Sequence, residues 1–116
     1  MKYKICYIDD LYYWISQVIN SIPKNIEYDF YYFNRISDIE FQEYDIVLLD
    51  YYLDKDWETS EVIIDTFKWS HIISFSSEKN KNVFMLNKWA NYAVTKLSDT
   101  NINLKLAKIL TKICNE

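Results

Sequence analysis

The 116-residue sequence contains no glycine and only one proline, Pro23. A chain without glycine lacks the Gly-rich loops of the known kinds that hold phosphates, which argues against a small flavin or nucleotide enzyme. It also lacks flexible linkers of the usual Gly, Ser or Pro composition. We therefore expect one domain spanning residues 1–116, with asparagine-rich segments such as residues 79–82 (KNKN) at its turns.

Cysteines and long apolar runs are scarce as well. The two cysteines, Cys6 and Cys114, stand in apolar contexts without a Cys-x-x-Cys spacing, which indicates free thiols rather than a disulfide or redox pair. No segment approaches the ~20 apolar residues of a membrane span, and the N-terminus lacks the apolar region of a signal peptide. The formal net charge of −4 argues against sequence-independent binding to a phosphate backbone. These absences favour a cytoplasmic protein that binds neither a membrane nor a nucleic acid.

The chain is rich in hydrophobic residues, which form short runs that alternate with helical patterns. Half of its residues are hydrophobic and 18% are aromatic, which is enough for one buried core. Near-continuous apolar runs predict five strands, at residues 3–8, 28–33, 45–49, 71–75 and 92–95. Apolar residues at helical spacing predict helices at residues 11–22, 36–41, 60–69, 78–90 and 102–113. This alternation predicts an α/β fold with a parallel sheet that helices cover on both faces.

Polar side chains follow four of the five predicted strands at the point where each strand ends. Ligands of an open parallel sheet bind beyond the carboxyl ends of its strands, so we expect these side chains to converge there. They are Asp9 and Asp10 after the first strand, Asp50 after the third, Ser76 and Ser77 after the fourth, and Lys96 after the fifth.

The chemistry of three converging carboxylates points to a cation. Two carboxylates ~4 Å apart repel each other by roughly 4 kcal/mol at an effective dielectric constant of 20, so three are costly without a cation between them. Mg²⁺ suits such a site because it prefers oxygen ligands and combines one or two carboxylates with water and phosphate oxygens. A carboxylate is also a nucleophile that can form an aspartyl phosphate.

Each of these residues, taken alone, also has a purely structural interpretation. Asp9, Asp10 and Ser76 are residue types that cap the N-termini of helices. A lysine such as Lys96 usually lies in solvent. Their combination at four strand ends is what indicates a functional site.

Four segments carry a resemblance to a known family: YIDD (residues 7–10), VLLDYYL (47–53), SFSSE (74–78) and VTK (94–96). In this order they resemble the receiver domain of bacterial two-component response regulators, over essentially the whole chain. The resemblance implies a flavodoxin-like (βα)5 fold, a three-layer sandwich with the strand order 2-1-3-4-5. It is similar in particular to single-domain, chemotaxis-type regulators.

The resemblance also implies a role for each polar residue. Asp50 would be the phosphoacceptor, Lys96 would pair with the phosphoryl oxygens, and Ser76 would be a switch hydroxyl that moves toward them. The ligands of Mg²⁺ would be Asp9, Asp10, Asp50 and the backbone carbonyl of Tyr52. The phosphodonor would be a sensor histidine kinase, a phosphotransfer protein or a small molecule, and a downstream protein would read the change. Such a domain turns over no substrate and is not an enzyme in that sense.

The sequence departs from the family pattern at three places. Leu97 stands where receivers carry a proline after the lysine, and residues 56–60 (DWETS) stand where they carry a glycine. Ala93 stands where they carry an aromatic switch residue on the fifth strand, and Tyr92 would face the other side of the sheet. These departures keep an alternative open, in which the same fold is a protein-interaction module that is not phosphorylated.

Overall fold

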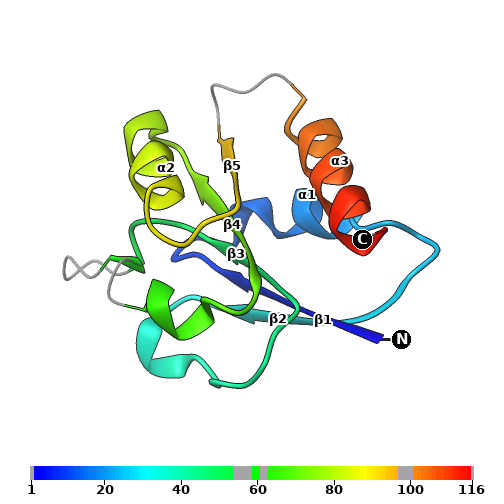
Figure 1. Cartoon of the computed structure of the whole chain (residues 1–116), viewed down its shortest axis with the longest axis horizontal. Helices are drawn as coiled ribbons and strands as arrows, with labels where there is room; N and C mark the ends of the chain where they lie inside the picture. Colours follow the sequence, from blue (N-terminus) through cyan, green and yellow to red (C-terminus); the bar gives the residue numbers. More distant parts are fainter. Residues whose placement is uncertain (1, 54–58, 61–62, 97–100, 116) are drawn as a thin grey trace.

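The computed structural model describes residues 2–53, 59–60, 63–96 and 101–115. Its centre is one parallel sheet in the order β2-β1-β3-β4-β5 (Figure 1). The strands are β1 (Lys2–Ile8), β2 (Glu27–Phe33), β3 (Ile46–Leu49), β4 (His71–Ser76) and β5 (Tyr92–Thr95). The predicted fold class and strand order are confirmed, and each predicted strand lies within one residue of the observed bounds.

The helices differ more from the prediction than the strands do. The structure has α1 (Ile15–Asn20), α2 (Lys79–Leu86) and α3 (Ile102–Cys114), together with the 3-10 turns η1 (Tyr12–Trp14), η2 (Ile36–Asp38) and η4 (Ile64–Phe67). At 13 residues, α3 is the longest helix of the described segments, and none of them is long and apolar enough to cross a membrane.

Two predicted helices are 3-10 turns in the structure. The segment 36–41 forms only η2, and the segment 60–69 forms η4 in the part that is described, with residues 61 and 62 outside it. Neither turn has a side-chain hydrogen bond at its N-cap. Short helices are marginal because nucleation is costly, so they depend on tertiary packing. The missing cap bond is not decisive, since α1 and α2 also lack one.

Apolar side chains pack against both faces of the sheet, which makes the predicted three layers. One face, with Ile5 and Tyr7, packs against α1 and α3. The other face, with Cys6 and Ile8, packs against η2, η4 and α2. Figure 1 shows α1 and α3 side by side, with α2 on the other side of the sheet. Successive residues of β1 thus alternate between the two cores, as the period of a strand requires.

The cysteines lie in these two cores. Cys6 is buried, Cys114 is half-buried, and both are free thiols, as predicted. Burial raises the pKa of the Cys6 thiol to about 12, so this side chain stays neutral. It therefore behaves as a small apolar residue of the core.

Candidate functional site

Acidic residues from two strand ends meet at the carboxyl edge of the sheet. The backbone N–H of Asp50 donates to the carbonyl of Ile8 at 2.9 Å, which extends the pairing of β1 and β3 beyond their last residues. This bond brings the end of β3 beside Asp9 and Asp10, which follow β1 directly. One carboxylate oxygen from each of the three acids lies within 4.8 Å of the other two.

Asp9 is fully buried, and each of its carboxylate oxygens accepts a hydrogen bond. Its Oδ1 accepts from the backbone N–H of Leu11 at 3.0 Å. Its Oδ2 accepts from the hydroxyl of Tyr7 at 2.5 Å and from the ammonium of Lys96. Its backbone carbonyl accepts from the hydroxyl of Tyr32 at 2.9 Å. Asp9 is therefore held in one orientation by groups from three strand ends.

The sequence did not point to the two tyrosines that hold Asp9. Tyr7 precedes Asp9 by two residues on β1, so strand periodicity places both side chains on one face, and that spacing is a signal the sequence offers. Tyr32 lies on β2 opposite Tyr7, with the ring centroids 5.6 Å apart. Its contact with Asp9 depends on the register of β1 and β2, which the sequence alone does not give.

Lys96 brings a buried ammonium group to the acids. The residue is 5% exposed, and its backbone N–H donates to the carbonyl of Ser76 at 2.9 Å. Its Nζ forms an ion pair with Asp9 and lies 3.6 Å from Oδ1 of Asp50. The same Nζ lies 4.9 Å from the centre of the Phe75 ring, which closes the apolar side of the site.

The negative charge of the buried Asp50 carboxylate is only partly balanced by neighbouring groups. The residue is 7% exposed, and the backbone N–H of Tyr51 donates to its Oδ1 at 2.9 Å. Burial raises its pKa to about 8; the Lys96 ammonium opposes this shift, and the charge of Asp9 adds to it. Burial also raises the pKa of Asp10, with a further contribution from Asp9. Both acids would therefore gain from an additional positive charge nearby.

The donor set fits a hard divalent cation such as Mg²⁺. Three ionised carboxylates against one ammonium leave an excess of two negative charges, which one divalent ion would balance. All three acids offer oxygen, the ligand atom that Mg²⁺ prefers. The raised pKa values of Asp10 and Asp50 agree with a site that is short of positive charge.

The remaining predicted site residues lie around this cluster. Ser76 is buried at the end of β4, and its hydroxyl accepts from the backbone N–H of Glu78 at 3.2 Å. Tyr52 is 39% exposed and forms a β-bridge with Thr59, while the role of its carbonyl as a metal ligand stays a prediction. Leu97 and residues 56–58, where the sequence departs from the receiver pattern, lie outside the described residues.

The position of the missing aromatic switch faces α2. Tyr92 packs into the core on the α3 side of the sheet, as its predicted orientation requires. Ala93 faces the opposite side and lines a groove of about 440 Å³ together with Lys79, Val83 and Leu86 of α2. No bulky side chain at this position of β5 fills the groove.

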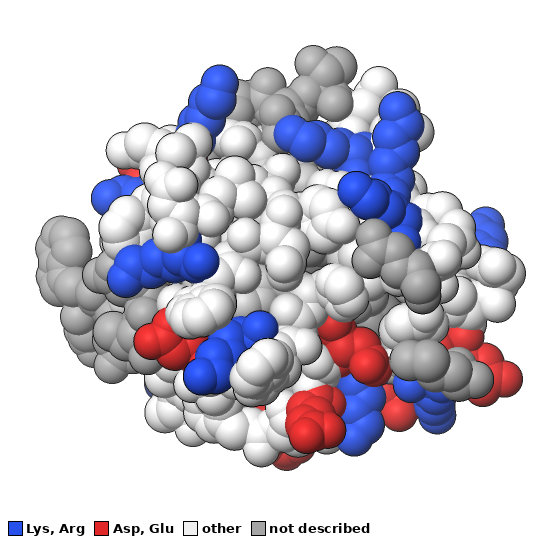
Figure 2. Space-filling view, in the orientation of Figure 1, with Lys and Arg blue, Asp and Glu red and all other residues white. Residues whose placement is uncertain are grey.

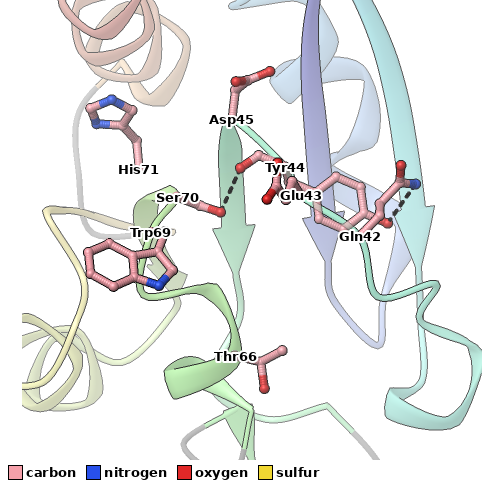
Figure 3. A pocket seen from close by; sticks show the side chains of 8 residues that line it. All are labelled: Gln42, Glu43, Tyr44, Asp45, Thr66, Trp69, Ser70 and His71. Atoms are coloured by element: carbon pink, nitrogen blue, oxygen red, sulfur yellow. Dashed lines mark hydrogen bonds between the residues drawn. The ribbon is translucent and has the colours of Figure 1, made fainter.

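A separate pocket of about 390 Å³ lies at the opposite end of the sheet, before β3 and β4. Its lining residues include Tyr44 and Ser70, whose carbonyl and hydroxyl are joined by a hydrogen bond of 2.6 Å. Figure 3 shows the side chains of Asp45, His71 and Thr66 pointing in different directions rather than toward one centre. The pocket shares no residue with the acidic cluster, so we assign the functional site to the cluster.

Comparison with known proteins supports the fold. No protein-family model and no curated protein sequence matches this chain. Many solved structures of receiver domains resemble it over nearly all of its length, and three of them illustrate the likeness. The first is a CheY-like response regulator receiver domain from Methanospirillum hungatei JF-1, with 20% identity, a TM-score of 0.69, and coverage of 99% of this chain and 96% of that one.

The other two structures are a BeF3-activated form and a metal-bound form of response regulators. The BeF3-activated receiver domain of DrrB, a Thermotoga maritima protein, has 19% identity, a TM-score of 0.71 and complete coverage of both chains. The Mn²⁺-bound response regulator Rcp1 has 14% identity, a TM-score of 0.73, and coverage of 92% of this chain and 91% of that one. At these identities the likeness establishes the fold: the chain has the fold of a response regulator receiver domain.

Proposed function

We propose that this protein is a phosphoryl-accepting receiver domain of a two-component phosphorelay, with Asp50 as the acceptor. The observation that carries the proposal is the meeting of Asp9, Asp10 and Asp50 with the Lys96 ammonium at the carboxyl edge of the sheet. Those strand ends are where open α/β sheets place their ligands. The receiver fold of the chain agrees with this role, which belongs to cytoplasmic signalling and requires no substrate turnover.

The proposed reaction transfers one phosphoryl group to the carboxylate of Asp50. An oxygen of Asp50 attacks the phosphorus atom of a phosphohistidine on a sensor kinase or phosphotransfer protein, or of a small phosphodonor. The new O–P bond forms as the P–N bond of phosphohistidine breaks. The leaving imidazole nitrogen keeps the electron pair and takes a proton from solvent. The product is an aspartyl phosphate, and no oxidant or further reactant is required.

The residues of the site contribute charge and position to this transfer. Asp50 must be ionised to attack, and its pKa, raised to about 8, leaves it mostly protonated near neutral pH. A bound Mg²⁺, held by Asp9, Asp10, Asp50 and the carbonyl of Tyr52, would favour the ionised form and neutralise the incoming phosphoryl oxygens. Lys96, whose Nζ lies 3.6 Å from Oδ1 of Asp50, would pair with one of those oxygens.

The face formed by α2, β5 and α3 is the surface we propose for a downstream partner. We call it the lysine-rich face, because Glu78 is the only acid among the described residues from 78 to 115. Figure 2 shows lysines over α2 and α3, while most of the acidic side chains on this view lie lower. Its lysines are Lys79, Lys81, Lys88, Lys105, Lys108 and Lys112. Val83 and Leu86 of α2, Trp89 between α2 and β5, and Leu104 of α3 are exposed as well, so a partner with acidic groups around an apolar contact would fit.

Phosphoryl-mimic binding tests the proposal directly. Wild-type protein with beryllofluoride and Mg²⁺ is expected to give a bound-fluoride signal in fluorine NMR, and acetyl phosphate is expected to add one phosphoryl group by intact mass. Asp50→Asn is expected to abolish both signals, because the amide is not a nucleophile.

The matched control for this experiment is Asp29→Asn. Asp29 is an aspartate far from the site in the sheet, exposed at its ion pair with Lys2, so its removal is expected to leave both signals unchanged. Equal labelling of wild type and Asp50→Asn, or no labelling of either, rejects the proposal.

A second candidate function is an interaction module that keeps the fold and is not phosphorylated. It is favoured by Ala93, which leaves β5 without an aromatic switch beside the groove. Titration with Mg²⁺ separates the two functions. Amide shifts near Asp10 and Asp50 are expected to respond in a phosphoryl-accepting receiver and to stay constant in the interaction module.

A further inference from the structure

Asn82 is a buried polar residue on the inner side of α2. It is 2% exposed and lies between α2 and the sheet, where it contacts the buried residues Ser74 and Thr95. A buried amide is costly unless it is hydrogen-bonded, so its partners show what the residue is for. The turn predicted for residues 79–82 is wrong, because these residues begin α2, and their polar sequence gave no sign of a buried amide.

The amide of Asn82 joins α2 to the ends of two strands. Its Oδ1 accepts from the hydroxyl of Ser74 at 2.6 Å and from the backbone N–H of Ser76 at 3.1 Å. Its Nδ2 donates to the carbonyl of Ser76 at 3.1 Å, to the carbonyl of Val94 at 3.2 Å and to the hydroxyl of Thr95 at 3.0 Å. One side chain of α2 thus binds β4 and β5 at the point where both strands enter the functional site.

Ser76 is the residue that Asn82 holds most firmly. Asn82 bonds to both the backbone N–H and the backbone carbonyl of Ser76, and that carbonyl also accepts from the N–H of Lys96. A displacement of Ser76 would break or stretch two hydrogen bonds of a fully buried amide. Because unsatisfied buried polar groups are costly, a concerted movement of Asn82 and α2 is favoured over a movement of Ser76 alone.

The side chain of Ala93 on β5 is too short to move in response to Ser76. An aromatic side chain at that position could move in response to Ser76, but the methyl group of Ala93 has no such reach. The groove beside it stays open between α2 and β5. The hydrogen bonds of Asn82 therefore join the site to the inner side of α2, in addition to the bond that the Glu78 N–H at the N-cap of α2 donates to the Ser76 hydroxyl.

We propose that Asn82 is a positioning residue that acts through Ser76 and transmits the phosphorylation state of Asp50 to α2. The inference rests on the proposed function, because Ser76 is displaced only if a phosphoryl group forms on Asp50. When Ser76 moves toward that group, the amide of Asn82 follows, and α2 shifts with it. Since α2 carries Lys79, Lys81 and the exposed Val83, the shift changes the lysine-rich face that we propose for the partner.

Hydrogen exchange of the α2 amides, measured with and without beryllofluoride and Mg²⁺, tests this inference. In wild type we expect the adduct to change exchange in α2 by roughly three- to tenfold, the effect of one altered hydrogen bond. Asn82→Leu has similar volume but no hydrogen-bonding groups, and Asn82→Ala leaves room for water. Both variants are expected to keep the adduct at Asp50 in fluorine NMR and to lose the response of α2.

The matched control is Ser74→Ala, which removes one bond of the Asn82 network and leaves both bonds to Ser76 in place. It is expected to keep the wild-type response of α2. An adduct in wild type without any response of α2 overturns the inference, and so does an unchanged response in whichever Asn82 variant folds. Failure of wild type to form the adduct is recorded separately by fluorine NMR, and it overturns the proposed function itself.

Discussion

Replacement of Lys96 by methionine is expected to destabilise the protein more than any other change to a single charge in the site. The Lys96 ammonium is buried, pairs with Asp9 and lies 3.6 Å from Asp50. Methionine keeps the apolar stem but removes the cation, which leaves two buried carboxyl groups without their partner. Removal of one partner from a buried ion pair typically costs about 3–5 kcal/mol, and we expect a loss of that size in the free energy of unfolding.

Urea unfolding of metal-free protein at about pH 8 measures this loss, because Asp50 is then about half ionised. Lys112→Met is the matched control: Lys112 lies on the exposed surface of α3, 5.6 Å from the Tyr92 ring, and its replacement is expected to change stability by less than about 1 kcal/mol. Lys96→Met should also bind beryllofluoride more weakly than wild type. If the two methionine variants unfold at the same urea concentration, the ammonium does not hold the acidic cluster together.

The sequence predicted the strands well because each strand is a short apolar run, and the central ones are buried on both faces. Residues 46–49 (IVLL) are fully buried, as expected for a central strand of a parallel sheet, whose residues form a near-continuous apolar run. The strand order came from the resemblance to receivers. Composition and periodicity indicated the parallel sheet but could not choose among its topologies.

Helix prediction was less accurate because helical spacing does not measure helix stability. The segment 36–41 has apolar residues at plausible positions, yet only Ile36–Asp38 forms a turn, and none of its residues is fully buried. By contrast, α3 has a continuous apolar stripe, with Leu106, Leu110 and Ile113 buried, and its predicted bounds differ from the observed ones by one residue. Tertiary burial of such a stripe is what stabilises most helices in proteins.

The acids of the candidate site could be predicted from the sequence because parallel strands end at one edge of the sheet. That rule places Asp9 and Asp50 near each other without any knowledge of side-chain packing. The same rule could not predict which groups hold these acids in place. Tyr32 reaches the backbone of Asp9 from another strand, and Asn82 reaches Ser76 from a helix, so both contacts depend on the register and packing of distant segments.

Asp50 is expected to make the metal-free protein less stable as the pH rises from about 4 to about 8. Its pKa is raised to about 8 in the folded state by burial, whereas an exposed aspartate of the unfolded chain titrates near ~3.9. Between these values the folded state binds more protons than the unfolded state, so the free energy of unfolding falls as protons are removed. Below about pH 4 both states are protonated, and Asp50 then contributes no pH dependence.

Thermal unfolding of wild type and Asp50→Asn in chelator, at about pH 5.5 and about pH 8, isolates this contribution from that of the other acids. The amide of the variant carries no charge at either pH. The variant is therefore expected to be more stable than wild type at the higher pH by at least about 1 kcal/mol, close to the free energy of one pKa unit. The difference is expected to shrink at the lower pH, where Asp50 is protonated in the folded protein.

Addition of Mg²⁺ should reverse the order of the two proteins at about pH 8. The cation competes with the proton for Asp50 and binds the folded state, so a concentration of about 100 Kd stabilises wild type by about 2.7 kcal/mol. Asp50→Asn lacks one of the three carboxylates, so Mg²⁺ should stabilise this variant much less. The buffer should contain no Ca²⁺, so that Mg²⁺ is the only divalent cation present. The gain of wild type should be smaller at about pH 5.5, because a proton must first leave Asp50. Stabilisation by Mg²⁺ that is equal in both proteins, or independent of pH, would mean that the cation binds away from the three acids. The site would then lack the charge balance on which phosphoryl transfer to Asp50 depends.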